Sequence, residues 1–297
     1  MYNSKVKKQK VIVILGQTAT GKSGLAVKIA KKVKGEIISA DSRQVYKGLD
    51  IGTGKITKKE MRGVSHHLLD VANPKNKFTI VEYQKLAIYA MAEIIKKGKV
   101  PIICGGTGFY IDAVTKGIVF PEVPPNTKLR KKLSLLDSRQ LLITLKKLDP
   151  VRAKNIDSKN KVRLIRAIEI AKALGKVPKI TQATPVYEFI KIGLYLPPDK
   201  LKKKIEKRVQ KMFKAGLLNE IKKLKKPVRL GGSGVSEKRL RELGFEYNKP
   251  TQEKVVAETI KYAKRQMTWF KRDKKIKWFN ATQISSVLAA IQKQLAK

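Results

Sequence analysis

The residues best suited to chemistry in this 297-residue chain form a phosphate-binding loop near its N-terminus. The loop matches the pattern G-x-x-x-x-G-K-[ST] and consists of Gly16, Gln17, Thr18, Ala19, Thr20, Gly21, Lys22 and Ser23. An apolar run precedes it and apolar residues at helical spacing follow it, which predicts a strand, a glycine-rich turn and a helix. Backbone N–H groups and the helix dipole there favour phosphate, Lys22 can reach the terminal phosphates, and the Ser23 hydroxyl can ligate Mg²⁺. The loop therefore predicts a di- or triphosphate ligand.

Two further residues are candidates for catalysis. Asp41 ends a short apolar run at 36–41, where a carboxylate can accept a proton from a nucleophile or help to hold Mg²⁺. Position alone equally allows an Asp that caps a turn or a helix. Thr107 lies in the Gly-Gly-Thr-Gly stretch 105–108, where its hydroxyl can bind a phosphate or a bridging oxygen. Glycines after a strand are more often only a turn, so Thr107 alone is a weak signal.

Basic residues gather in several segments and suit contact with an RNA backbone. They include Arg130, Arg163 and Arg166, with the last two three residues apart on an expected helix. A second segment mixes basic and aromatic residues: Lys264, Arg265, Trp269 and Phe270. A solvated helix face is the alternative for the first group, and core packing is the alternative for the two aromatic residues. The only histidines, His66 and His67, have no further metal ligands at suitable spacing, which favours structural packing.

Alternating strands and helices must position these groups. Expected strands cover 11–15, 36–41, 100–104 and 189–196, and expected helices cover 79–97 and 251–271. This order predicts an α/β fold with a parallel sheet of the P-loop NTPase type flanked by helices. Ligands bind such sheets at the C-terminal ends of the strands, where the loop, Asp41 and Thr107 all fall. A basic helical segment interrupts the core, so we expect a core of 1–120 and 186–297 with an inserted helical subdomain at 121–185.

The composition narrows the setting. Lys and Arg number 67 against 23 Asp and Glu, giving a formal charge of +44. This excess favours a polyanionic partner, of which nucleic acid is the first candidate, and its self-repulsion favours a monomer. No apolar stretch approaches the roughly 18 residues of a membrane helix, and residues 1–10 lack the apolar region of a secretory signal. A single cysteine, Cys104, excludes an internal disulfide, so we expect a cytoplasmic protein.

Taken together, the motifs resemble those of the tRNA dimethylallyltransferases, also called tRNA isopentenyltransferases, over nearly the whole chain. Residues 41–55 resemble the family signature DSxQVYxGxDIGTxK, and residues 66–70 resemble HHLxD. Residues 105–110 match GGTxxY, residues 163–169 match RxxRAxE, and residues 263–269 match AKRQxTW. A phosphate loop alone fits many families, whereas this ordered set is highly specific.

The resemblance implies transfer of a dimethylallyl group from dimethylallyl diphosphate to N6 of adenosine 37, in the anticodon stem-loop of tRNA. Residues 16–23 would then bind the donor's diphosphate with Mg²⁺, and Arg241 would lie near that diphosphate. Asp41 would accept the N6 proton and Thr107 would hydrogen-bond near the reacting centre. The flipped adenosine would be held by Asp41, Ser42, Arg43 and Gln44. Arg130, Arg163 and Arg166 would grip the stem-loop from the inserted subdomain, which becomes a tRNA-binding subdomain, and Lys264 and Arg265 would add contacts to the tRNA.

Two positions depart from the family pattern, and other functions remain open. Phe245 stands where the family usually has Tyr, and Ile260 where it usually has Arg, which puts the C-terminal tRNA contacts in doubt. One alternative is a small-molecule kinase that uses ATP on the same loop. Another is a prenyltransferase that acts on free AMP or ADP, and a third is a non-catalytic RNA-binding protein. The basic insertion argues against the first two, and the intact Lys22, Ser23 and Asp41 argue against the third.

Overall fold

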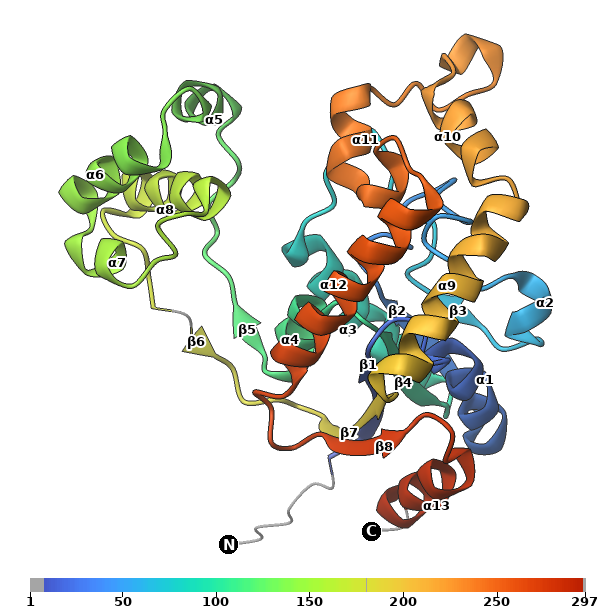
Figure 1. The fold of residues 1–297 in the computed structure, drawn as a ribbon. Helices are drawn as coiled ribbons and strands as arrows, with labels where there is room; N and C mark the ends of the chain where they lie inside the picture. The colour runs from blue at the N-terminus through green and yellow to red at the C-terminus, as the bar shows by residue number, and fades with distance from the viewer. Residues whose placement is uncertain (1–7, 180, 296–297) are drawn as a thin grey trace, which may run out of the picture. The chain divides into compact units, whose positions relative to one another are not determined.

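A six-stranded parallel sheet forms the centre of the computed structural model, which describes residues 8–179 and 181–295 (Figure 1). Its strand order is β3-β2-β4-β1-β7-β8, and every neighbouring pair is parallel. The strands are β1 (Lys10–Gly16), β2 (Gly35–Ala40), β3 (His66–His67), β4 (Val100–Gly105), β7 (Glu188–Tyr195) and β8 (Lys277–Asn280). The predicted α/β fold with a parallel sheet flanked by helices is confirmed.

Alternation along the strands builds a hydrophobic core on each face of the sheet. Val11, Val13 and Leu15 of β1 belong to one cluster, whereas Ile12 and Ile14 belong to the other. Successive side chains of a strand point to opposite faces, so a continuous apolar run such as 11–15 is typical of a strand covered on both sides. All five of these side chains are buried.

Helices cover both faces of the sheet and shape the loops at its C-terminal edge. Residues of α1 (Lys22–Val33) and α13 (Ile284–Leu295) join the cluster on one face, and those of α3 (Ile80–Lys96) and α4 (Gly108–Thr115) join the other (Figure 1). A third cluster joins α9 (Pro198–Lys214) to α12 (Gln252–Phe270). The shorter helices around the sheet are α2 (Lys58–Met61), α10 (Leu217–Lys225), α11 (Glu237–Leu243), η1 (Val228–Leu230) and η2 (Phe245–Tyr247).

The structure adds three features to the expected elements. The basic stretch 201–226 forms two helices, because Gly216 adopts the left-handed conformation between α9 and α10. Strand β8 extends the sheet beyond β7, and helix α13 follows it, although we predicted no element in either place. The glycine-containing stretch 227–236 contains the short helix η1.

The chain divides into two compact units. One comprises residues 1–117 and 184–297, and the other comprises residues 118–183, beside the expected insertion of 121–185. The second unit contains α5 (Thr127–Ser134), α6 (Ser138–Leu148), α7 (Pro150–Lys154), α8 (Lys161–Leu174), and the antiparallel pair β5 (Ile118–Val119) and β6 (Thr181–Gln182). Its helices pack around Leu141, Leu145, Leu164 and Ile168, so it has a hydrophobic core of its own.

Two predictions concerned a secretory signal and a membrane-spanning helix. The prediction that no secretory signal is present concerned residues 1–10. Most of these, residues 1–7, lie outside the described residues. Within 8–179 and 181–295, no helix combines the length and apolar character needed to cross a membrane.

Candidate functional site

The phosphate loop connects β1 to α1 and has the backbone shape of an anion site. Gly16 ends the strand with a φ of 129°, and a side chain there would meet the Leu194 carbonyl oxygen at 2.2 Å. Ala19 and Gly21 also have positive φ, which turns the chain toward the first turn of α1. The Thr20 hydroxyl donates to the Gln17 carbonyl oxygen at 2.7 Å and stiffens this turn. The loop therefore presents backbone N–H groups and a helix N-terminus together, as the sequence pattern predicts.

The Lys22 side chain folds back over the phosphate loop, and its surroundings disfavour the charged form. Its Nζ donates to the Gln17 carbonyl oxygen at 2.6 Å. The pKa of Lys22 is lowered to about 8, chiefly by burial and in part by Arg208, although Cys104 and Asp41 act in the opposite direction. A bound anion would restore full protonation, because opposite charge favours the ammonium form. Lys22 is therefore placed to bind an anionic group in the loop.

Asp41 follows β2 and closes a tight turn with its own side chain. Its Oδ1 accepts hydrogen bonds from the backbone N–H groups of Arg43 at 2.8 Å and Gln44 at 3.3 Å. No hydrogen bond to Oδ2 is found in the described part of the chain. The turn-capping alternative is therefore correct for one oxygen, while the second oxygen is available for a substrate proton. Both functions fit one carboxylate.

Thr107 connects the loop after β4 to the loop after β2. Its Oγ1 accepts a hydrogen bond from the Ser42 N–H at 3.0 Å, and its backbone N–H donates to the Ala40 carbonyl oxygen at 3.1 Å. Gln44 lies in the same region, and its Nε2 donates weakly to the carbonyl oxygens of Thr53 and Gly54, both at 3.4 Å. Thr107 and residues 41–44 therefore form one connected surface at the ends of β2 and β4.

Gln266 of α12 joins this surface to the phosphate loop. Its Oε1 accepts a hydrogen bond from the Thr18 N–H at 2.8 Å, and its Nε2 donates to the Gly106 carbonyl oxygen at 2.9 Å. The side chain is buried, and a side chain on Gly106 would meet its Nε2 at 2.2 Å. Tyr262, one helical turn earlier, lies beside both Thr107 and Gln266. One helix thus holds the loops after β1 and β4 at a fixed separation.

Arg208 of α9 is a site residue that the sequence analysis missed. Its guanidinium donates to the Thr18 Oγ1 at 3.3 Å and to the Thr53 carbonyl oxygen at 2.9 Å. Arg241, which the family resemblance places near the diphosphate, is exposed on α11 and acts electrostatically on the carboxylate of Glu237. A signal for Arg208 was present, because it is the single arginine in the lysine-rich stretch 201–226.

Several motif residues hold the site loops in place rather than lining the site. Lys55 is almost fully buried and pairs with Asp50 at 2.7 Å and Asp70 at 2.5 Å, which joins the two signature segments. The Nε2 of His67 lies 2.7 Å from Glu36, in agreement with a structural role for this histidine. His66 Nδ1 lies 2.8 Å from the Val64 carbonyl oxygen.

The arginines expected to contact RNA lie in the unit 118–183 and differ from one another. Arg130 and Arg166 both bind the buried Glu169, at 2.7 Å and 2.5 Å, so they stabilise the unit's own fold. Arg163 is exposed and lies 3.9 Å from Asp157. Arg163 and Arg166 therefore differ in their neighbours, because Arg166 pairs with the carboxylate one helical turn away, and RNA contact by either residue stays a prediction.

The C-terminal basic segment is part surface and part core. Lys264 and Arg265 are exposed on α12, while Phe270 is buried and Trp269 donates from Nε1 to Asp112 at 3.0 Å. The two departures from the family pattern, Phe245 and Ile260, both pack against the cluster between α9 and α12. These apolar side chains therefore stabilise the helix pair that carries Arg208 and Gln266.

A magnesium ion would find few protein ligands here. The described residues contain no group of three or more His, Cys, Asp or Glu side chains arranged to hold a metal. Ser23 is exposed in the first turn of α1 and lines a cavity of about 240 Å³ with Gly54 and Glu60. Because Mg²⁺ commonly takes one or two protein oxygens and otherwise phosphates and waters, this donor set fits an ion that enters with a phosphorylated ligand.

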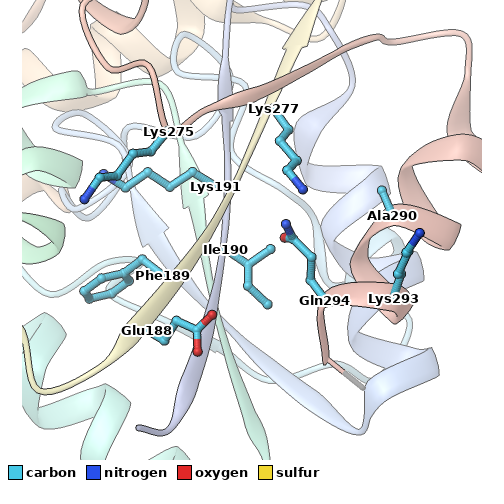
Figure 2. Close-up of a pocket in the computed structure, with 9 residues that line it drawn as sticks. All are labelled: Glu188, Phe189, Ile190, Lys191, Lys275, Lys277, Ala290, Lys293 and Gln294. Carbon is cyan, nitrogen blue, oxygen red and sulfur yellow. The ribbon is translucent and has the colours of Figure 1, made fainter. Parts of the chain in front are cut away.

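A lysine-rich cavity of about 390 Å³ lies apart from this site. It is lined by the first half of β7, by Lys275 and Lys277, and by α13 (Figure 2). Lys191, whose Nζ pairs with Asp273 at 2.7 Å, is buried in its wall. Since β1 and β7 are parallel, the first half of β7 lies toward the end of the sheet opposite the phosphate loop. We assign it no part in the chemistry of the site.

The chain is similar to known proteins over almost its full length. The IPP transferase family model matches residues 44–273. A tRNA dimethylallyltransferase of Anoxybacillus flavithermus is 38% identical over 92% of this chain and 91% of its own, and one of Bacillus subtilis is 38% identical over 93% and 92%. The crystal structure of a tRNA isopentenylpyrophosphate transferase from Bacillus halodurans is 33% identical, covers 97% of both chains and superposes with a TM-score of 0.68. This chain therefore belongs to the IPP transferase family.

Proposed function

We propose that this protein transfers a dimethylallyl group from dimethylallyl diphosphate to tRNA, at N6 of adenosine 37. One observation carries the proposal: hydrogen bonds connect the loops after β1, β2 and β4, which contain the phosphate loop, Asp41 and Thr107. A phosphate site and a free carboxylate oxygen are thereby held together by Gln266 and Thr107. This pairing suits a reaction in which an anionic group leaves while a nucleophile loses a proton.

The chemistry is an alkylation with a diphosphate leaving group. The N6 lone pair forms a bond to the allylic carbon, and the bond between that carbon and the diphosphate oxygen breaks. Lys22, Arg208 and the loop N–H groups stabilise the charge on the leaving diphosphate. The N6 proton passes to Oδ2 of Asp41, while its Oδ1 keeps the turn in place. The Ser23 hydroxyl would hold a Mg²⁺ ion, which would add positive charge beside the diphosphate.

The acceptor is held by the loop after β2 and by basic surfaces. Ser42, Arg43 and Gln44 hold the extruded adenosine beside Asp41, and Thr107 orients the group at the reacting centre. Arg163, Lys264 and Arg265 are exposed and contact the RNA backbone, with the accessible parts of Arg130 and Arg166 adding to the grip. The unit 118–183 is then a tRNA-binding insertion. A role for Arg241 stays a prediction.

The proposed function also bears on the oligomeric state, the cellular location and the metal of the enzyme. The charge of +44 attracts RNA phosphates, and it disfavours self-association. On this ground we propose a monomer, and we further propose that it acts in the cytoplasm and uses Mg²⁺. Sedimentation of the protein with and without the anticodon stem-loop tests the monomer.

The test of function uses one substitution that separates chemistry from folding. In Asp41→Asn the side-chain oxygen still accepts the two turn hydrogen bonds, but the proton acceptor is lost. We expect transfer to fall by roughly 10²- to 10⁴-fold, with unchanged tRNA binding and melting temperature. Asp199→Asn, an exposed change on α9, is the matched control. Near-normal transfer by Asp41→Asn would show that Asp41 is not the base.

The readout is mass spectrometry of nucleosides from tRNA treated with protein and dimethylallyl diphosphate. Parallel reactions contain ATP in place of the prenyl donor, or AMP in place of tRNA. Phosphoryl transfer from ATP without prenylation would establish the kinase alternative. Faster prenylation of AMP than of tRNA would establish the adenylate prenyltransferase.

A further inference from the structure

Glu220 of α10 holds three successive backbone N–H groups of the signature segment 41–55. Its Oε2 accepts hydrogen bonds from the N–H groups of Asp50 at 3.0 Å and Ile51 at 2.7 Å, and its Oε1 accepts one from Gly52 at 3.1 Å. Successive N–H groups that converge in this way form a concave anion site on the backbone. Here the anion is a side chain of the protein itself, which lies 168 to 170 positions away in the chain.

Tyr247 completes the set of donors around the Glu220 carboxylate. Its hydroxyl donates to the Glu220 Oε1 at 2.9 Å, and burial together with this carboxylate raises the pKa of Tyr247. A Cβ on Gly52 would lie 2.6 Å from the Tyr247 hydroxyl oxygen, so the segment can pass this side chain only as glycine. The carboxylate thus accepts four hydrogen bonds, which is about the full capacity of its two oxygens.

The backbone held by Glu220 contacts Arg208 immediately beyond these N–H groups. The Thr53 carbonyl oxygen accepts a hydrogen bond from the Arg208 Nη2 at 2.9 Å, and a side chain on Gly54 would overlap the same guanidinium. The Arg208 Nη1 donates to the Thr18 Oγ1 of the phosphate loop at 3.3 Å. A short run of backbone therefore connects Glu220 to a guanidinium that contacts the phosphate loop.

Other contacts maintain the internal shape of this segment without Glu220. The Lys55 Nζ pairs with the Asp50 carboxylate at 2.7 Å, and the Thr53 hydroxyl donates to the Leu49 carbonyl oxygen at 2.6 Å. We therefore expect the segment to stay folded when the Glu220 carboxylate is removed, because these bonds remain. What it loses is the connection to α10, and with it the fixed position of the Thr53 carbonyl oxygen.

We propose that Glu220 is a positioning residue for the donor site, which places the Thr53 carbonyl oxygen and thereby aims the Arg208 guanidinium at the diphosphate. The inference rests on the proposed function in one respect, namely that diphosphate binds at residues 16–23. Glu220 acts through the backbone of the signature segment, and the four hydrogen-bond donors described around it all belong to the protein.

Glu220→Gln tests this role, because the amide has the same shape but carries N–H donors at one end. That end faces backbone N–H groups or the Tyr247 hydroxyl, so at least one of these donors loses its acceptor. We expect the affinity for inorganic diphosphate with Mg²⁺ to fall by roughly 3- to 10-fold, as is typical of coupling within one hydrogen-bond network. Glu253→Gln, an exposed change at the start of α12, removes the same charge and should bind diphosphate like wild type.

A second background separates positioning from a general loss of structure. Arg208→Met keeps a long side chain but removes its hydrogen-bond donors, so a displaced Thr53 carbonyl oxygen no longer misdirects a guanidinium. In the Arg208→Met background, Glu220→Gln should lower diphosphate affinity by less than about twofold. A merely structural role would give the same loss in both backgrounds. Calorimetric titration measures the four affinities, and thermal denaturation checks that each variant is folded at the temperature of the titration.

The outcomes separate this inference from the proposed function. Unchanged diphosphate affinity in Glu220→Gln, or an equal loss with and without Arg208, overturns the role of Glu220 while leaving diphosphate binding intact. Absence of diphosphate binding by the wild type overturns the proposed function, and this inference with it. Glu220→Asp keeps the charge, but its carboxylate ends a methylene group short of the N–H groups. If Glu220→Gln fails to fold, Glu220→Asp replaces it in the same comparison, and its loss of affinity must likewise depend on Arg208.

Discussion

Replacing Gln266 by Leu should separate the two halves of the site. Leu fills a similar volume but offers no hydrogen bond, so the Thr18 N–H and the Gly106 carbonyl oxygen both lose their partner. A buried polar group without a partner costs about 1–3 kcal/mol. Gly106 should bear most of that cost because its bond is buried, whereas water can reach the partly buried Thr18 N–H. We expect the free energy of unfolding to fall by about 2–4 kcal/mol.

Two measurements follow this change. Thermal denaturation should show a melting temperature lower by roughly 5–10 °C for a protein of this size. Titration of diphosphate should show an affinity lower by roughly 5- to 30-fold if about 1–2 kcal/mol of the loss falls on ordering the phosphate loop. Gln210→Leu, at an exposed position of α9, is the matched control and should change neither quantity.

A charged replacement sharpens the test. Gln266→Glu keeps an oxygen for the Thr18 N–H but places a second oxygen against the Gly106 carbonyl oxygen, so it should weaken stability and diphosphate binding as well. If Gln266→Leu unfolds and binds diphosphate like wild type, Gln266 does not hold the loops together. Lower stability with unchanged diphosphate affinity would show that the bridge serves folding alone.

Two other predictions concern charges outside the reacting centre. Hydrogen bonds from Lys99 and His67 overcome burial and lower the pKa of Glu36 to about 2, so its stabilisation is complete above pH 4.5 and is lost between pH 4.5 and 2. Glu36→Gln should therefore lower the free energy of unfolding by about 2 kcal/mol at pH 7, allowing for screening at the half-exposed Lys99, and match wild type near pH 2 in urea titrations. In the insertion, Arg130→Ala should lower the melting temperature, whereas Arg163→Ala should leave it unchanged and reduce the salt dependence of RNA binding. Equal melting temperatures for the two variants, or an unchanged salt slope for Arg163→Ala, would contradict these assignments.

Local patterns were sufficient to predict the sheet strands near the site. Residues 11–15 and 100–104 are apolar runs that end in glycine, and such runs report directly on burial and on the turn that follows. Strand β8 escaped prediction because only four residues pair with β7, and lysines are frequent at its start. Its place in the sheet depends on a partner strand far away in the chain, which no local window contains.

Among the site residues, too, local motifs predicted some, and contacts between distant segments decided others. Lys22 and Asp41 belong to motifs whose spacing carries their chemistry, so the sequence identified them. Arg208 carries no such spacing, since it belongs to a helix distant in sequence from the phosphate loop that it contacts. Arg130 and Arg166 show the converse, because the sequence indicated their basic character but not the ion pairs that both form with the buried Glu169.

By itself, the sequence determined the family, the parallel sheet and the phosphate loop, because each depends on residues that lie close together in the chain. Only the tertiary structure decided which side chains meet at the ends of the strands. Gln266 reaches Thr18 across 248 positions, and Arg208 reaches it across 190. Such contacts form only when the packing of α9 against α12 brings distant segments together, and their free energy depends on burial, which a linear pattern does not contain.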